Sequence, residues 1–345
     1  MPKLTLLCAL TVLVSGTLFA GVMKESKSSV TFRGFGKLVT EETIYISGPM
    51  KRSDSEGEFD GEGIVGGFVG DLFMEEGNTG EIVDLKKLEL TRINHEDEEY
   101  TVAPIKKLDF SGLTKSDQST DREQEEKKSS VREIRSIFRI TPTGERKRIN
   151  DFNAEKYTLL MLREWENTTD GTRGIDSLFT TIWTTQLSAQ QEKAIQEEQS
   201  FHLEYMKALG METSPLFNDV MGTSWMAMFS QMKKESRDAS AEDKRRFDQF
   251  TKEAEKLKGY PVLIDGSYFQ IDPNAKKEEK KEEEAPDVTS VGGLFGSITK
   301  EITKSDAPVG LQPAFSYYTE ILGLEFQTVD TDRFVAPVDY ERKTE

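Results

Sequence analysis

One stretch with helical periodicity, residues 188–258, interrupts a sequence that otherwise has the pattern of short strands. The stretch predicts three successive helices, with approximate bounds 188–209, 215–234 and 240–258. A glycine follows the first and the third, which is typical of helix ends because glycine adopts the left-handed backbone there. A chain with one helical block among strands has to pack that block against its sheet.

The second predicted helix differs from the others because it is apolar nearly all round: Leu216, Phe217, Val220, Met221, Trp225, Met226, Ala227, Met228, Phe229 and Met232. Such a helix is either covered on several sides or faces an apolar partner. Methionine side chains are flexible and polarizable, so a Met-rich surface adapts to varied partners. Two interpretations remain open, a buried helix or the wall of a cavity for an acyl chain or another apolar ligand.

Alternating apolar and polar residues before and after this block predict an antiparallel sheet. The expected strands are 30–38, 42–46, 50–54, 80–85, 88–94, 100–102, 131–141, 157–162, 175–185, 260–264, 267–271, 316–329 and 333–338. Asp265-Gly266 predicts a tight turn between two of them. A charged linker is expected over 274–287, where Lys and Glu alternate without an apolar face.

The N-terminus is typical of a secretory signal peptide. Lys3 precedes the apolar run Leu4–Val14, which is too short to span a bilayer, and the small residue Ala20 suits a cleavage site. We therefore expect residues 1–20 to be removed and 21–345 to form a single exported domain, periplasmic or extracellular, without a transmembrane anchor. The alternative is an uncleaved anchor.

The charge and the cysteine content exclude several classes of function. A net charge of −17 repels phosphate backbones, so no nucleic-acid partner is expected. The single cysteine, Cys8, lies inside the predicted signal peptide, so a mature chain would have no disulfide, thiol nucleophile or thiolate metal site.

Several short segments occur in an order that resembles a family of bacterial exported proteins of unknown function: Thr43–Ile46, Met50–Arg52, Gly80–Leu85, Tyr157, Ile182–Thr185, Gly259–Val262, Thr319–Ile321 and Phe334–Tyr340. That family is distantly similar to the periplasmic lipoprotein-carrier proteins. The resemblance implies an α+β fold, in which a curved antiparallel half-barrel sheet holds helices in its concave face. In the carrier proteins that concavity holds lipid, and the family has no agreed catalytic residues to transfer.

One residue pair in the helical block combines side chains that occur in catalytic and metal sites. Glu198 and His202 are four residues apart and share a helix face, which suits a Glu–His hydrogen bond or part of a metal site. Their spacing is not that of a zinc protease, and no G-x-S-x-G nucleophile elbow exists. His95 lies among four acidic residues, which is typical of a solvated turn and also compatible with a metal.

The sequence thus favours a non-catalytic extracytoplasmic binding protein that carries a lipid or another amphipathic ligand between sheet and helices, without a cofactor. The residues expected to line that space are Trp183, Met221, Trp225, Met228 and Phe229. The alternatives are an envelope scaffold that contacts a protein partner through its acidic segments, and a carboxylate- or metal-dependent hydrolase using Glu198 and His202.

Overall fold

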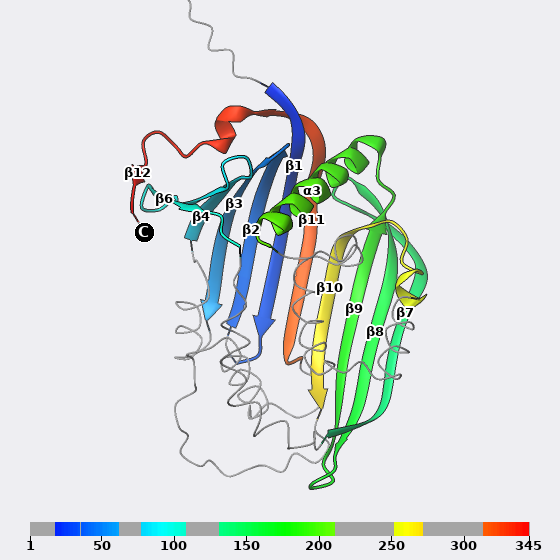
Figure 1. Cartoon of the computed structure of the whole chain (residues 1–345). Helices are drawn as coiled ribbons and strands as arrows, with labels where there is room; N and C mark the ends of the chain where they lie inside the picture. The colour runs from blue at the N-terminus through cyan, green and yellow to red at the C-terminus, as the bar shows by residue number, and fades with distance from the viewer. Residues whose placement is uncertain are drawn as a thin grey trace, which may run out of the picture.

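The computed structural model describes residues 18–34, 36–61, 77–107, 131–210, 252–271 and 313–344. Twelve strands of this part of the chain form one sheet, in the order β12-β6-β5-β4-β3-β2-β1-β11-β10-β9-β8-β7 (Figure 1). Their bounds are β1 Leu18–Phe32, β2 Gly36–Ser47, β3 Met50–Gly61, β4 Gly77–Asp84, β5 Glu89–Asn94, β6 Glu99–Pro104, β7 Val131–Ile149, β8 Phe152–Asn167, β9 Arg173–Thr185, β10 Tyr260–Ile271, β11 Phe315–Asp330 and β12 Glu341–Arg342. Neighbouring strands are antiparallel, except that β12 runs parallel to β6.

Helix α3, Ala189–Ala208, lies across one face of this sheet and contacts β11, β1 and β2 (Figure 1). Its start follows from local chemistry, because the Ser188 hydroxyl accepts from the Gln191 backbone N–H while the Gln191 side chain binds the Ser188 N–H. Gly210 follows with a φ of +74°, which only glycine adopts readily. The prediction of a first helix over 188–209 is therefore confirmed.

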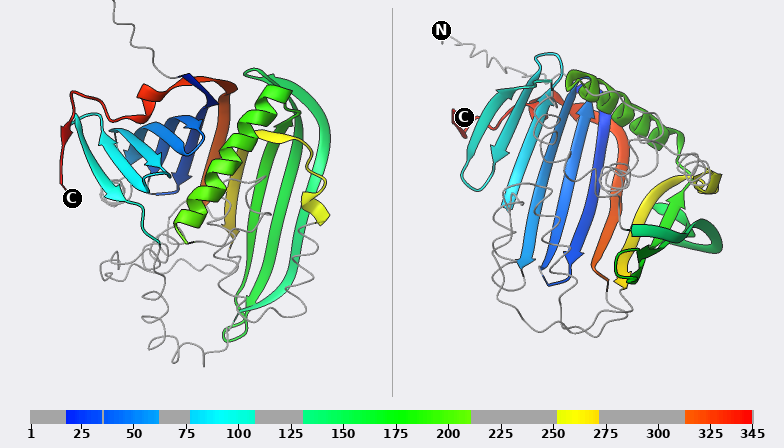
Figure 2. Two further views of the ribbon diagram at one scale, coloured as in Figure 1. Left: turned by 45° about the horizontal axis from the view of Figure 1, so that its top comes forward. Right: turned by 60° about the horizontal axis from the view of Figure 1, so that its bottom comes forward.

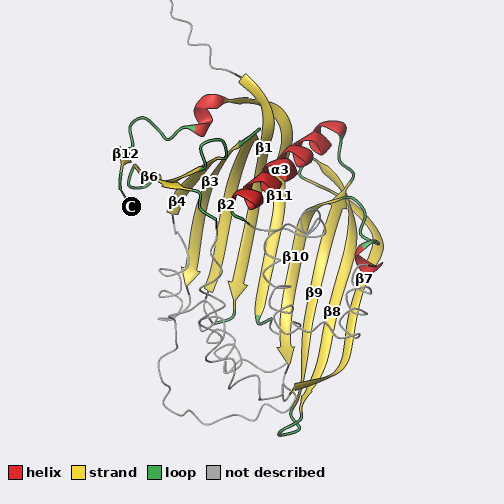
Figure 3. Cartoon of the chain, in the orientation of Figure 1, coloured by secondary structure: helices red, strands yellow, loops and turns green. Residues whose placement is uncertain are grey.

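The predicted fold class is wrong. Strands dominate the described residues, and their sheet is open and mixed rather than a half-barrel with helices packed in a concave face (Figure 3). Besides α3, Lys252–Ala254 have helical backbone, followed by a short 3-10 helix η1, Thr331–Phe334, near the C-terminus. The second predicted helix, 215–234, lies outside the described residues. Periodicity reports which residues alternate, but sheet closure depends on strand tilt and register, which a local pattern does not encode.

Three strand predictions also differ from the structure. The predicted strand 30–38 is broken by a turn, where Gly34 has a φ of +81°. The Asp265-Gly266 turn is absent, since both residues pair with β9 and β11 inside the continuous strand β10. The predicted strand 333–338 is replaced by η1 and an irregular segment that leads to β12.

The two faces of the sheet carry separate clusters of buried residues, and Figure 2 shows that α3 lies across one of these faces. Val22, Ile46 and Val83 lie on the face that α3 covers, where Ala194 and Phe201 of the helix pack against them. On the opposite face, Ile82, Ile93 and Val329 pack against Phe334 of the C-terminal segment. The alternation of strand side chains produces this division.

Strand β1 overlaps the predicted signal peptide. Its first three residues, Leu18 to Ala20, pair with Asp330 to Thr328 of β11. Cleavage after Ala20 would remove these three pairs and leave Gly21, opposite Gln327, as the first residue of the strand. The cleavage itself stays a prediction.

Candidate functional site

The strongest candidate is an apolar surface that crosses six strands on the α3 side of the sheet. One row of mutually opposite residues consists of Phe32, Phe315, Tyr268, Leu178, Met161 and Phe138, from β1, β11, β10, β9, β8 and β7. The next row consists of Val30, Tyr317, Gly266, Thr180, Leu159 and Ile140. We call these two rows the apolar face.

The apolar face lies on the same side of the sheet as α3, but at the other end of the strands. Val22, Val30 and Phe32 alternate along β1 with an unbroken register to β2, so their side chains point to one side. The helix crosses the upper part of β1 in Figure 1, whereas Phe32 is the last residue of that strand. Helix α3 therefore does not reach this end of the face, where Leu257 packs against the buried residues of the rows on β7, β8 and β9.

Four aromatic rings form the centre of the apolar face. The Phe315 ring lies 5.2 Å from the Tyr268 ring in a stacked arrangement, and 6.1 Å from Phe32 and 6.2 Å from Tyr317, as centroid distances. All four side chains are half-buried, whereas Leu159, Leu178 and Ile140 beside them are fully buried. Aromatic pairs at these distances stabilise each other beyond their burial.

The apolar face contains three hydroxyl groups, those of Tyr268, Tyr317 and Thr180. Burial raises the pKa of Tyr268 and of Tyr317 well above that of free tyrosine, so both hydroxyls are neutral at physiological pH. The Tyr317 hydroxyl lies 2.7 Å from Oγ1 of Thr180, within hydrogen-bonding distance. The Tyr268 hydroxyl bonds to the Asp176 side chain, which lies outside the two rows. An apolar surface whose few hydroxyl groups are neutral and bonded suits an apolar ligand with a few polar atoms.

Gly266, which led to the prediction of an Asp265-Gly266 turn, lies inside strand β10 beneath the ring of Tyr317. A Cβ on Gly266 would lie 2.2 Å from Cζ of Tyr317, so the tyrosine ring occupies the space above the glycine. The same arrangement recurs at Gly174, where a Cβ would lie 2.2 Å from the Trp165 ring. An aromatic side chain laid over a glycine in the neighbouring strand is a known way to support glycine in a sheet.

Of the five predicted lining residues, the structure describes Trp183, while Met221, Trp225, Met228 and Phe229 lie outside the described residues. Trp183 is 7% exposed and points to the side of β9 opposite to Leu178 and Thr180. The amino group of Lys147 lies 4.3 Å from the Trp183 ring centroid, which is a cation–π contact. Trp183 therefore does not belong to the apolar face.

An open depression of about 450 Å³ lies between the start of β8 and the connection from β9 to α3. Phe152, Asn153, Thr185 and Leu187 contribute to its lining, together with the capping residues of α3. The side chains of Ser188 and Gln191 already bond to each other's backbone N–H groups in the capping box, so these two side chains are not free to bind a ligand.

The predicted pair Glu198 and His202 lies where α3 packs on the sheet. Glu198 accepts from Nζ of Lys24 at 2.7 Å, and the neighbouring Glu197 accepts from the backbone N–H of Gly48 at 2.8 Å. Burial and the charge of Lys51 lower the pKa of His202. Within the described ranges, no three His, Cys, Asp or Glu side chains come together in a way that could hold a metal ion.

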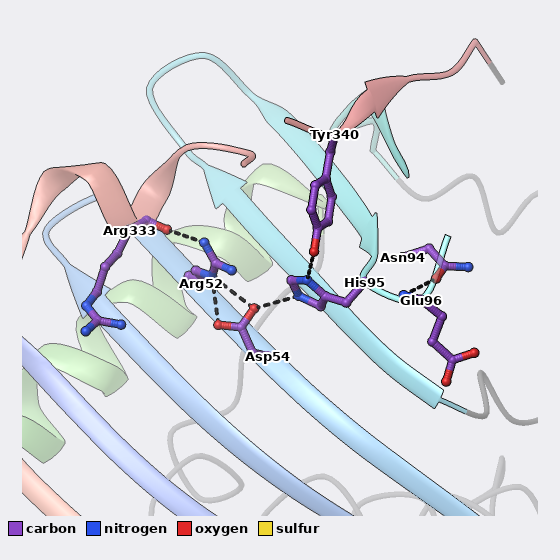
Figure 4. A network of polar contacts seen from close by, with 7 residues as sticks. All are labelled: Arg52, Asp54, Asn94, His95, Glu96, Arg333 and Tyr340. Atoms are coloured by element: carbon purple, nitrogen blue, oxygen red, sulfur yellow. Dashed lines mark hydrogen bonds and ion pairs between the residues drawn. The ribbon is translucent and has the colours of Figure 1, made fainter. Parts of the chain in front are cut away.

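His95 belongs to a polar network that sequence reasoning missed (Figure 4). Its Nδ1 lies 3.0 Å from the Tyr340 hydroxyl, and its Nε2 lies 3.3 Å from Oδ1 of Asp54. Both carboxylate oxygens of Asp54 accept from Nε of Arg52, at 2.9 and 2.7 Å. Arg52 also donates to the carbonyl oxygen of Arg333, at 3.0 Å.

This network joins the C-terminal segment to β3 and to the turn after β5, and that joining is its evident role. Gly80 makes room for it, because a Cβ there would lie 2.9 Å from both Asp54 Oδ1 and His95 Nε2. The Tyr340 hydroxyl is also held by the imidazole, with the two rings edge to face. The predicted turn at His95 is confirmed, but its imidazole is only 14% exposed and so is not solvated as expected. The acidic residues beside it in the sequence gave no signal for these partners.

No family model, curated protein or solved structure matches this chain. Among the helices of the described residues, none has the length and hydropathy needed to cross a membrane. The site therefore has to be interpreted from its own geometry.

Proposed function

We propose that this protein is a non-catalytic binding protein that takes up a lipid or another amphipathic ligand on the apolar face. The observation that supports the proposal is the row of half-buried aromatic side chains at the end of the sheet away from α3. Covering these side chains with an apolar ligand is favourable, because free energy is gained when apolar surface is removed from water.

The size of the gain is consistent with reversible binding. Completing the burial of one of these aromatic side chains contributes at most about 1 kcal/mol, since burying such a residue fully contributes about 2–3 kcal/mol and most of each side chain is already buried. Four rings, Phe32, Phe315, Tyr268 and Tyr317, therefore contribute at most about 4 kcal/mol before association costs and further contacts are counted. An acyl chain that also contacts Val30 and Met161 would add to this gain.

The test uses 1-N-phenylnaphthylamine, a fluorophore that brightens in apolar surroundings, and then a fluorescent fatty acid. We expect both probes to bind the full-length protein, and Phe32→Lys or Phe315→Lys to weaken binding by about tenfold, which corresponds to 1.4 kcal/mol. Phe179→Lys is the matched control, since Phe179 is 47% exposed and points to the opposite side of β9. Its binding should equal that of the unmodified protein.

Two results would refute the proposal. One is the absence of binding by either probe, and the other is equal loss in Phe179→Lys and Phe315→Lys. Urea unfolding of each variant separates loss of the site from loss of the fold, and Phe32→Ala provides a milder change at the end of β1.

The exported location is also a proposal, and it is supported by the sequence pattern of residues 1–20. N-terminal sequencing of the protein from its native host should start at Gly21. A chain that starts at Met1 would contradict the location, while the binding test above stands independently.

A further inference from the structure

Strand β7 forms one edge of the sheet and differs in charge from the rest of the chain. Six of its residues are Arg or Lys and two are Glu, in a protein with a net charge of −17: Arg132, Arg135, Arg139, Arg146, Lys147, Arg148, Glu133 and Glu145. Among the described strands, β7 has one neighbour, β8, so its other side is an edge (Figure 3). A basic edge on an acidic protein favours a partner that carries negative charge.

The backbone of this edge already binds a carboxylate. The N–H of Ile140 donates to Oε2 of Glu253 at 2.9 Å, so this N–H points away from β8. The register between β7 and β8 is unbroken from Arg135 to Pro142, and strand N–H groups alternate in direction. The N–H of Ser136 therefore points to the same open side as that of Ile140.

The charges that flank this part of the edge are exposed. Arg132, Arg146 and Arg148 pair with carboxylates on or near β8. By contrast, Arg135 has no ion pair within the part of the chain that the structure describes, and Arg139 lies close enough to Glu253 to help lower the pKa of its carboxyl. The surface near Ser136 thus combines outward backbone donors with guanidinium groups.

The charge pattern argues against pairing of two copies of β7. When two copies of this strand pair antiparallel with Ser136 opposite Phe138, Arg135 of one copy lies opposite Arg139 of the other, and like charges in opposite positions destabilise a pair. An incoming strand that carries carboxylates reverses the sign of that interaction. Strand addition supplies affinity through backbone hydrogen bonds and specificity through the alternating side chains.

We propose that the outer edge of β7, centred on Ser136 with Arg135 and Arg139, binds an extended acidic peptide segment of a partner protein by strand addition. The inference is independent of the proposed ligand on the apolar face. The competing explanation is that the charges, Pro142 and the two register shifts of β7 protect the edge from aggregation.

The test measures fluorescence anisotropy of a short fluorescein-labelled peptide in which Glu and Val alternate, with a Lys-Val peptide as control. The full-length protein should bind the acidic peptide and not the basic one, and added salt should weaken binding. Ser136→Pro removes the outward N–H without touching the ladder to β8, and proline is tolerated at such edge positions. We expect about tenfold weaker binding in Ser136→Pro and unchanged binding in Ser136→Ala.

Charge reversal provides the second arm. Arg135→Glu with Arg139→Glu should abolish binding of the acidic peptide and allow the basic peptide to bind, whereas Lys37→Glu, an exposed site on the interior strand β2, should change neither. Absence of binding by the unmodified protein would overturn the proposal. Equal affinity of Ser136→Pro and Ser136→Ala would also overturn it, because charge alone would then explain the attraction and edge protection would be the better account.

Discussion

Breaking the contact between Lys24 and Glu198 should weaken the attachment of α3 to the sheet. Nζ of Lys24 lies 2.7 Å from Oε1 of Glu198, and the two side chains are 16% and 25% exposed. Burial alone would lower the pKa of Lys24, but Tyr260 and Glu198 outweigh it and raise the pKa above the ordinary lysine value. The ammonium group is therefore charged at every physiological pH, and its partner is needed.

The magnitude follows from the burial of the pair. Removing one partner of a fully buried ion pair costs about 3–5 kcal/mol, because the other charge stays buried without compensation. Since both side chains keep some contact with water, we expect Lys24→Met or Glu198→Gln to lower the free energy of unfolding by about 2–3 kcal/mol. The double variant Lys24→Met with Glu198→Gln leaves no unpaired buried charge, so it should lose no more than either single variant, about 2–3 kcal/mol. The coupling between the two sites is then also about 2–3 kcal/mol.

The assay is urea unfolding followed by far-ultraviolet circular dichroism, for both single variants and the double variant. Lys27 and Glu41 provide the matched control, since they form an ion pair from the same strand β1 but are 42% and 55% exposed. Lys27→Met should leave stability unchanged. The reasoning is refuted if Lys24→Met is as harmless as Lys27→Met, or if the double variant loses the sum of the two single losses.

Three further outcomes are expected. Stability should fall as the pH rises above about 10, because burial raises the pKa of Tyr268 and Tyr317. Their contribution is complete below the pKa of unfolded tyrosine and is lost as the pH rises toward the folded pKa, so the urea midpoint should be the same at pH 7 and pH 9 and lower at pH 11. Gly266→Ala should destabilise the protein by about 1–3 kcal/mol through its clash with Tyr317, and Tyr317→Ala in the same chain should remove that clash, which a thermal unfolding series would detect as non-additivity. Tyr340→Phe should lower the free energy of unfolding by about 1 kcal/mol, because it removes the hydroxyl beside His95. Amide hydrogen exchange should become faster in the C-terminal segment alone, and an exchange rate there equal to that of the unmodified protein would contradict the network's joining role.

The sequence alone predicted the elements that local chemistry determines. The bounds of α3 follow from the Ser188 cap and from Gly210, and the strands 80–85, 88–94 and 175–185 correspond to β4, β5 and β9. In each case the deciding interactions join residues that are close in sequence, so periodicity and turn chemistry are sufficient.

The tertiary structure decided the features that depend on distant partners. Asp265-Gly266 has the composition of a turn, but Tyr317 of β11 covers the glycine and keeps β10 extended. Trp183 was expected in the ligand site, yet its odd position along β9 places it on the other side from Leu178.

The open form of the sheet and the apolar face arise in the same way, from pairings between strands far apart in the chain. β1 lies between β2 and β11, and Phe32 meets Phe315 across almost the whole length of the sequence. No local pattern specifies which strands become neighbours, because a strand's alternation states which side is apolar and leaves its partner open. The partner of each strand is the one that gives the whole sheet its lowest free energy, and this depends on all strand pairings together.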